Sequence, residues 1–263
     1  MNKGERHEII AILTLAHACS SAGSIPRFGQ VKKVQPVSDR VRNYNVAAAS
    51  KLNPSALKDL PAGKLMAIAK RIGVKKAPSS AKADVKVNGR LVSLKSLCNA
   101  PPALVNHTTR PGWEFAAAQC GGSLSELDKA VARYWRRRKR GLIGEDVLNC
   151  GSCSPFWAAR KEIEPLLVYF MFKGTGTKCS VAPASLILEF GDPTDLASWR
   201  VRTPRTVVNH LWCRLVFSVR SKKGMPKNYP SVSARYANTK SSIARWTVYW
   251  QNEHRGALHV RVR

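Results

Sequence analysis

Residues 3–19 carry apolar positions at helical spacing. Ile9, Leu13 and Ala16 recur four and three positions apart, which is the period of one face of a helix. Asn2 stands directly before this segment, where a residue that caps a helix is favoured. The pattern therefore predicts a helix over residues 3–19.

The same pattern predicts the other regular elements. One helix is expected from Pro61 to about Ile72, with Gly73 ending it, and another over residues 123–140. The proline-containing segment 99–111 predicts a loop. Alternating helix and strand pieces are expected at residues 161–172, 184–190, 207–220 and 244–262, with a terminal hairpin formed by 245–251 and 257–263. This alternation favours an α/β fold.

A β-hairpin around Asn88 and Gly89 is the strongest local signal. Apolar and polar residues alternate on both sides of this pair, which is typical of a two-residue turn. Such a turn sets Asp84 opposite Ser93, with Cβ atoms roughly 5 Å apart, and Lys95 one diagonal step away. Side chains alternate between faces, so these three share one exposed face. The other face is apolar and would meet the core, with Val85, Val87, Val92 and Leu94.

A carboxylate, a hydroxyl and an ammonium on one patch suit the hydrolysis of a phosphodiester. Asp84 would hold Mg²⁺, which keeps several waters and bridges to a phosphate oxygen. Lys95 would bind the phosphate and orient or help deprotonate the attacking water. Glu5 and Glu8, three apart on the first helix, are expected to supply a further carboxylate. The alternative is an ordinary surface hairpin and an acidic first helical turn that complements the helix dipole.

Charge narrows the class of partner. Lys and Arg number 44 and Asp and Glu 16, so the net charge is +28. A polyanion relieves this self-repulsion, which makes nucleic acid the leading partner class and a membrane surface the second. No stretch reaches about 18 uninterrupted apolar residues, so no transmembrane span is expected. Two early glutamates and an odd number of cysteines favour an intracellular location, cytoplasmic and bacterial or virus-encoded, with reduced thiols.

Basic segments indicate where DNA would bind. The run at residues 133–140 interleaves two aromatic with six basic residues, and on a helix it would follow phosphates without reading sequence. A solvated helix end is the alternative. Residues 106–108 follow the hairpin closely and would lie near the cleaved strand, unless they form an ordinary polar loop. The DNA-binding candidates are Asn106, His107, Thr108, Arg136, Arg137, Arg138, Lys139, Arg140, Arg220, Lys222 and Lys223.

Two pairs of residues have the types that bind zinc. Cys150 and Cys153 form one pair, and His210 and Cys213 the other, so together they could make a four-ligand site. The pairs are far apart in the sequence and the His-to-Cys spacing is loose. Buried structural thiols are therefore the favoured interpretation.

Three segments resemble known nucleases. Asp84, followed after eight residues by Ser93-Leu-Lys95, resembles the PD-(D/E)xK nuclease core. Residues 2–8 (NKGERHE) look like the start of some type II restriction endonucleases, notably the HpaII-like group. Residues 81–96 look like that group's hairpin, in which serine also takes the place of the second acid. Residues 100–109 are similar to the polar loop that follows, and nothing as sharp lies beyond about residue 122.

The resemblance implies a central mixed β-sheet flanked by helices and a Mg²⁺-dependent, sequence-specific nuclease. It implies Asp84 as metal ligand, Lys95 as catalytic lysine and Ser93 at the variant acid position. Glu5 is the first choice for the helix carboxylate and second metal ligand, and Glu8 is its runner-up. Either a helix glutamate replaces the missing acid, or the site holds one metal ion.

The resemblance also implies partners and an organisation. The substrate would be double-stranded DNA, cut by a homodimer on a palindrome, with a cognate DNA methyltransferase. One domain over residues 1–263 would comprise a helical part (1–83), the catalytic hairpin and loop (84–122) and a DNA-binding, sheet-completing part (123–263). The alternatives are a non-catalytic basic nucleic-acid-binding protein of ribosomal or nucleoid type, and a homing endonuclease or junction resolvase with the same core.

Overall fold

The computed structural model describes residues 1–37, 43–98, 103–220, 246, 248–250 and 253–263. The chain forms two compact units, one made of Met1–Pro102 with Ser180–Thr206 and the other of Ala103–Cys179 with Val207–Arg263. Helices and a β-sheet occur in both units, so the prediction of a mixed α/β fold with a sheet flanked by helices is confirmed. Among the described residues, no helix combines the length and apolar character needed to cross a membrane.

The sheet of the first unit is mixed. Its central pair, β5 and β8, is parallel, and the remaining neighbours are antiparallel. A separate two-stranded sheet joins β1 (Ser24–Ile25) and β2 (Gly29–Gln30). The strands of the five-stranded sheet are, in spatial order, β3 (Val34–Gln35), β4 (Val85–Val87), β5 (Arg90–Ser96), β8 (Leu186–Phe190) and β9 (Arg200–Arg202).

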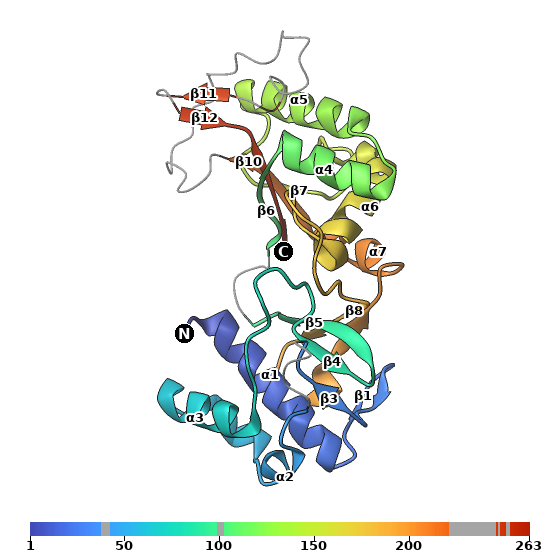
Figure 1. Ribbon diagram of the computed structural model, residues 1–263. Helices are drawn as coiled ribbons and strands as arrows, with labels where there is room; N and C mark the ends of the chain where they lie inside the picture. The colour runs from blue at the N-terminus through green and yellow to red at the C-terminus, as the bar shows by residue number, and fades with distance from the viewer. Residues whose placement is uncertain (38–42, 99–102, 221–245, 247, 251–252) are drawn as a thin grey trace. The chain divides into compact units, whose positions relative to one another are not determined.

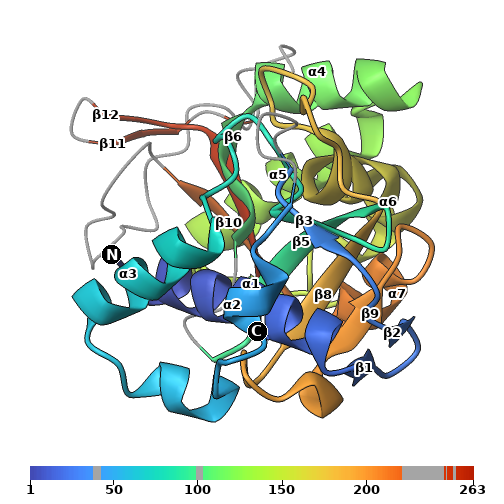
Figure 2. The same ribbon diagram turned by 60° about the horizontal axis from the view of Figure 1, so that its bottom comes forward.

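Helix α1 (Lys3–Ser20) lies along this sheet and contacts β5 (Figures 1 and 2). Its predicted cap is confirmed: the Asn2 side chain accepts a hydrogen bond from the Glu5 backbone N–H at 2.9 Å, and the Glu5 carboxylate accepts one from the Asn2 backbone N–H at 3.1 Å. The other helical segments of the unit are α2 (Val46–Ala49), η1 (Pro54–Lys58), α3 (Ala62–Ile72) and η4 (Leu196–Ser198).

The predicted hairpin is confirmed in its turn and in its register. Asn88 and Gly89 have φ angles of 49° and 81°, the left-handed conformation that a type I′ turn requires. The Asn88 side chain also accepts the backbone N–H groups of Lys32 and Lys33, which fixes the turn against the chain before β3. Val85 pairs with Val92, as expected. The apolar face is buried in the core beside α1, with Val85, Val87, Val92 and Leu94.

The sheet of the second unit is antiparallel. Its strands are, in spatial order, β6 (Ala103–Thr109), β13 (Ala257–Val262), β10 (Leu215–Arg220) and β7 (Val147–Leu148). A separate pair joins β11 (Val248–Trp250) and β12 (Glu253–Arg255). The helical segments are α4 (Arg110–Cys120), α5 (Ser125–Lys139), η2 (Trp157–Ala159), α6 (Arg160–Val168), its continuation η3 (Tyr169–Lys173), α7 (Val207–Leu211) and η5 (Trp212–Arg214).

Two predictions about this unit are wrong. The described part of the predicted loop, residues 103–111, is not a loop, because β6 pairs with β13 and α4 begins at Arg110 with Pro111 in its first turn, where proline is tolerated. In the described part of the predicted terminal hairpin, residues 248–250 do not pair with residues 257–262. Strand β13 instead pairs with β10 and β6, and β11 pairs with β12. Both errors arise from long-range strand pairing, which local patterns do not show.

A buried carboxylate anchors the second unit. Asp128 on α5 is 4% exposed and accepts two hydrogen bonds from the Arg110 guanidinium, at 2.9 and 3.0 Å. The indole N–H of Trp246 donates to the same carboxylate at 2.7 Å. One side chain therefore joins the start of α4, helix α5 and a residue more than a hundred positions later.

Candidate active site

The hairpin holds the Asp84 carboxylate in a defined orientation. One oxygen accepts the Leu94 backbone N–H at 2.6 Å and the Ser93 hydroxyl at 3.1 Å. Ser93 is 1% exposed, whereas Asp84 and Lys95 are half-buried. The predicted meeting of Asp84 and Ser93 across the hairpin is therefore observed, and Ser93 orients the carboxylate as a hydrogen-bond donor.

Helix α1 brings Glu8 to this hairpin. The pKa of Glu8 is raised from 4.5 to about 7, mainly by burial and in addition by the negative charge of Asp84, while the positive charge of Lys95 opposes the rise. These charges act on Glu8 only because its carboxyl lies near the hairpin. The chain thus places a second acid beside Asp84 and Lys95, at the cost of partly burying it.

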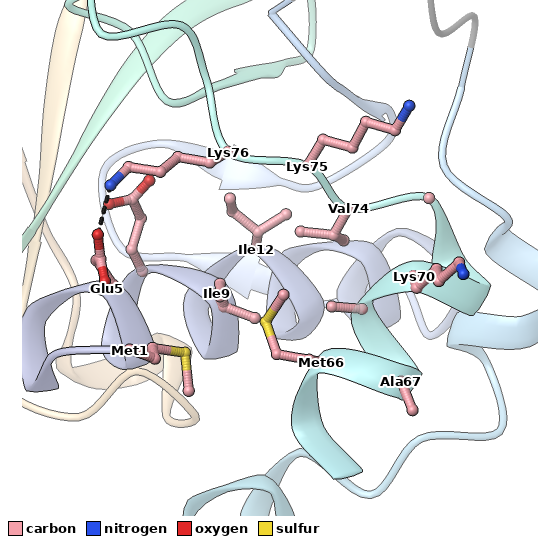
Figure 3. A pocket seen from close by; sticks show the side chains of 13 residues that line it. Met1, Glu5, Ile9, Ile12, Met66, Ala67, Lys70, Val74, Lys75 and Lys76 are labelled. Carbon is pink, nitrogen blue, oxygen red and sulfur yellow. Dashed lines mark hydrogen bonds and ion pairs between the residues drawn. The ribbon is translucent and has the colours of Figure 1, made fainter. Parts of the chain in front are cut away.

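The Glu5 carboxylate is bound to other groups than the hairpin. One of its oxygens completes the helix cap with Asn2, and the other forms an ion pair with Lys76 at 2.6 Å (Figure 3). The hydrogen bond from Lys76 is the main reason why the pKa of Glu5 is lowered. The geometry therefore favours Glu8 over Glu5 as the helix carboxylate of the site. The capping motif of residues 2–5 is readable in the sequence and could have indicated this.

Two charged residues near Lys95 were missed by sequence reasoning. Glu189 pairs in register with Lys95 on the neighbouring parallel strand, but it is 6% exposed and bound to Arg202 at 2.7 Å. Lys82 precedes the hairpin and interacts electrostatically with Asp84 and Lys95. Lys82 stands two residues before Asp84, so continued strand alternation in the sequence would predict both on one face. This signal was available in the sequence.

A cavity of about 730 Å³ adjoins the two glutamates. It lies between α1, α3 and the segment that follows α3, and Figure 3 shows Ile9, Ile12 and Val74 forming its apolar wall. Glu5 and Glu8 both line it. The carboxyl of Glu8 is therefore bordered by apolar surface on this side, in keeping with the raised pKa.

The carboxylates limit what metal chemistry the site can support. In the described parts of the chain, no three His, Cys, Asp or Glu side chains are grouped so that they could hold a metal ion. Asp84 and Glu8 are two hard oxygen donors, which fits Mg²⁺, because this ion commonly uses one or two carboxylates and keeps its waters. They do not form a closed protein cage.

The DNA-binding candidates belong to the second unit. Asn106 is exposed on β6, and His107 and Thr108 are half-buried there. His107 stacks on His259, with ring centroids 4.7 Å apart. At the end of α5 the described side chains are exposed at Arg136, Lys139 and Arg140 and half-buried at Arg137 and Arg138. The side chain of Arg220, and Lys222 and Lys223, lie outside the described residues.

The exposure of three cysteines differs from the expectation. Cys150, Cys153 and Cys213 are free and exposed, so the interpretation as buried structural thiols is wrong. Cys150 and Cys153 follow the edge strand β7, and Cys213 lies in η5, directly before β10. No three-ligand group that includes them is found in the described residues.

The chemistry of this site is read from its own residues. Asp84 is bound by the Ser93 hydroxyl, and its charge acts on Glu8 and Lys82, as does the charge of Lys95. Carboxylates and ammonium groups are the side chains that bind a divalent cation and a phosphate. No protein-family model matches the chain, and neither curated proteins nor solved structures gave a significant match.

Proposed function

We propose that the chain is a Mg²⁺-dependent endonuclease of the PD-(D/E)xK type that hydrolyses phosphodiester bonds in double-stranded DNA, as type II restriction enzymes do. The placement of the Glu8 carboxyl beside Asp84 and Lys95 carries this proposal. Acids that are buried against their own preference, next to a like charge, are concentrated at functional sites. A structural hairpin has no need of this arrangement.

Each residue has a part in the proposed reaction. Asp84, held by the Leu94 N–H and the Ser93 hydroxyl, and Glu8 would hold Mg²⁺. When bound, this ion lowers the pKa of a coordinated water and offsets charge on the phosphate. The Lys95 ammonium binds the phosphate and stabilises the negative charge that grows on its oxygens in the transition state.

The charge of the chain supports DNA as the substrate. A net charge of +28 attracts a polyanion, and the exposed Arg136, Lys139 and Arg140 at the end of α5 provide contacts for phosphates. Cleavage of both strands at one site is simplest for a homodimer on a palindrome. If the chain is a restriction enzyme, a cognate DNA methyltransferase would protect the host's own sites.

Incubation of the pure protein with supercoiled plasmid, with and without Mg²⁺, tests the proposal. We expect discrete fragments only with Mg²⁺, and loss of cleavage but not of DNA binding in Asp84→Asn and Lys95→Ala. Lys86→Gln is the matched control, because Lys86 lies on the neighbouring strand β4 and, like Asp84 and Lys95, is half-buried. Sequencing the fragment ends would give the recognised site and the cut position.

The charge alone equally supports a non-catalytic nucleic-acid-binding protein. This candidate predicts a gel shift with every variant and no cleavage by the wild type at any Mg²⁺ concentration. Full cleavage by Asp84→Asn would instead leave the endonuclease in place and remove the site assignment.

A further inference from the structure

A second cavity of the first unit, with a volume of about 290 Å³, is lined by basic residues. Its lining comes from α1, from the end of η1 and from the segments directly after β5 and β8. Because β5 and β8 are parallel, their carboxyl ends lie at the same edge of the sheet, where ligands of open α/β sheets commonly bind. We call this cavity the basic pocket, and its polar and charged side chains are Lys3, Arg6, His7, Lys58, Cys98 and Asp192.

Hydrogen bonds between these elements fix the walls of the basic pocket. Nδ1 of His7 and the Ser96 hydroxyl are 2.8 Å apart and share a hydrogen bond, which joins α1 to the last residue of β5. The Leu97 N–H donates to the Phe190 carbonyl at 2.9 Å, so the segments that leave β5 and β8 stay together. The pocket is therefore formed before any ligand binds.

Arg6 is oriented by backbone carbonyls at the end of η1. Its Nη2 donates to the carbonyls of Lys58 and Leu60 at 2.7 and 2.6 Å. These oxygens carry only partial charges, so they position the guanidinium without neutralising it. Within the described residues, the Nε and Nη1 groups of Arg6 have no hydrogen-bond partner. An arginine that is oriented in advance loses little conformational freedom when it binds an anion.

The basic pocket carries more positive than negative charge. Lys58 forms an ion pair with Asp192, the acidic residue of the described lining. Lys3 and Arg6 take part in no ion pair in the parts of the chain that the structure describes. The Lys3 side chain is exposed at the start of α1, so it can meet a ligand without rearrangement of the helix. Two positive charges thus remain uncompensated, and they favour an anion.

A phosphate of a nucleic acid backbone is the anion that suits this chain. Phosphate oxygens accept charge-assisted hydrogen bonds from guanidinium and ammonium groups, and such contacts hold a strand without reading its sequence. The net charge of +28 attracts the polyanion as a whole. Helix α1 and strand β5 also carry the candidate active site, because Glu8 follows His7 and Lys95 precedes Ser96.

We propose that the basic pocket binds a backbone phosphate of the nucleic acid other than the one that is cleaved, with Lys3 and Arg6 as its ligands. The proposal rests on nucleic acid as the proposed substrate and adds a place where its backbone is held. It does not depend on cleavage.

The salt dependence of DNA binding measures the contact. In buffer without Mg²⁺ the DNA stays intact, so the affinity for a short duplex can be titrated at several salt concentrations. Each phosphate contact that is lost lowers the magnitude of the slope of log K against log salt concentration by about 0.9. We expect this decrease for Lys3→Gln and retention of the slope in Lys3→Arg, which keeps the charge.

Lys64→Gln is the matched control. Lys64 is an exposed lysine in the first turn of α3, as Lys3 is in α1, and it lines neither cavity. Its replacement should leave the slope unchanged. Thermal melting checks folding, and Lys3→Gln should melt no lower than the wild type, because a positive charge in the first helical turn opposes the helix dipole. Arg6 is not replaced, since its Nη2 also holds the end of η1.

Asp192→Asn should have the opposite effect. Asparagine keeps an oxygen for the Thr194 N–H, which donates to Oδ1 of Asp192 at 2.8 Å, but it removes the charge that holds Lys58. The released ammonium makes the basic pocket more positive. We expect the variant to bind the duplex more tightly than the wild type at the same salt concentration. Unchanged or weaker binding would contradict the charge argument.

Cys98 provides a readout at the basic pocket itself, because its thiol is exposed and lines the cavity. Alkylation of each cysteine is followed by peptide mass spectrometry, with and without saturating duplex. We expect the duplex to slow the alkylation of Cys98 several-fold in the wild type and much less in Lys3→Gln. Cys179, an exposed cysteine of the second unit, should react alike in both proteins. Protection of Cys98 by millimolar inorganic phosphate but not by the duplex would assign the pocket to a free phosphate and overturn the proposal.

The pocket and the endonuclease fail in different ways. If the wild type does not cleave, but Lys3→Gln lowers the slope and loses the protection of Cys98, the endonuclease function is wrong and the phosphate pocket stands. If the wild type cleaves, but Lys3→Gln keeps the wild-type slope and the duplex leaves Cys98 unprotected, the phosphate pocket is wrong and the endonuclease stands.

Discussion

The variant Glu8→Gln tests whether the ionised carboxyl of Glu8 lowers the free energy of unfolding. In the unfolded chain Glu8 ionises near pH 4.5, and in the folded protein its pKa is about 7. Its contribution to stability is thus complete below pH 4.5 and is lost as the pH rises to 7. Converted fully into free energy, the difference between the folded and unfolded pKa of Glu8 corresponds to about 3 kcal/mol. Partial exposure of Glu8 to solvent reduces the expected effect on stability to about 1–3 kcal/mol.

Glutamine is neutral at every pH and nearly isosteric, so it removes this penalty. Urea unfolding of both proteins at pH 4.5 and pH 8.5 measures the effect. We expect Glu8→Gln to be more stable than the wild type by about 1–3 kcal/mol at pH 8.5 and to show little gain at pH 4.5. Plasmid cleavage by this variant should be lost.

Glu5→Gln is the matched control, because it lies one turn earlier on the same helix. Glu5 is bound to Lys76 and caps α1, so its replacement should lower stability at pH 8.5, opposite in sign to Glu8→Gln. A pH-independent difference for Glu8→Gln would refute the environment assigned to Glu8. Greater stability with undiminished cleavage would refute its role in the reaction.

Two further predictions concern the metal and the second unit. At pH 8 and constant ionic strength, Mg²⁺ should raise the melting temperature of the wild type more than that of Asp84→Asn, because only the wild type has both carboxylates; equal rises would speak against the metal site. Asp128→Ala should lower the free energy of unfolding by about 3–5 kcal/mol in urea titrations, since it leaves the Arg110 guanidinium and the Trp246 indole without their shared acceptor, and a loss below 1 kcal/mol would contradict this reasoning.

Local signals predicted the hairpin and the first helix closely. The Asn88-Gly89 turn fixes the register of two strands, and the register fixes which side chains share a face. The meeting of Asp84 and Ser93 follows from the turn alone. The helix over residues 3–19 follows from its period and its cap, and both are properties of neighbouring residues.

Contacts between distant segments could not be predicted in this way. The resemblance ranks Glu5 ahead of Glu8. The capping motif speaks against Glu5, but the ion pair that Glu5 forms with Lys76, in the chain after α3, could not be predicted from neighbouring residues. Likewise, residues 99–111 look like a loop because of their prolines. Residues 103–109 form a strand because β13, at the other end of the chain, supplies a partner strand, and a helix starts at Arg110.

The location of the unfavourable charges is itself an argument about function. A burial-raised pKa at Glu8 and a burial-lowered pKa at Lys82 both occur within reach of Asp84, on segments that are far apart in the sequence. Folding alone would favour neutral residues at both positions. An acid that is difficult to ionise and an amine that is difficult to protonate, set around one oriented carboxylate, become favourable together once a divalent cation and a phosphate are bound. Binding of these ligands would offset the destabilising effect of the two charged groups in the free protein.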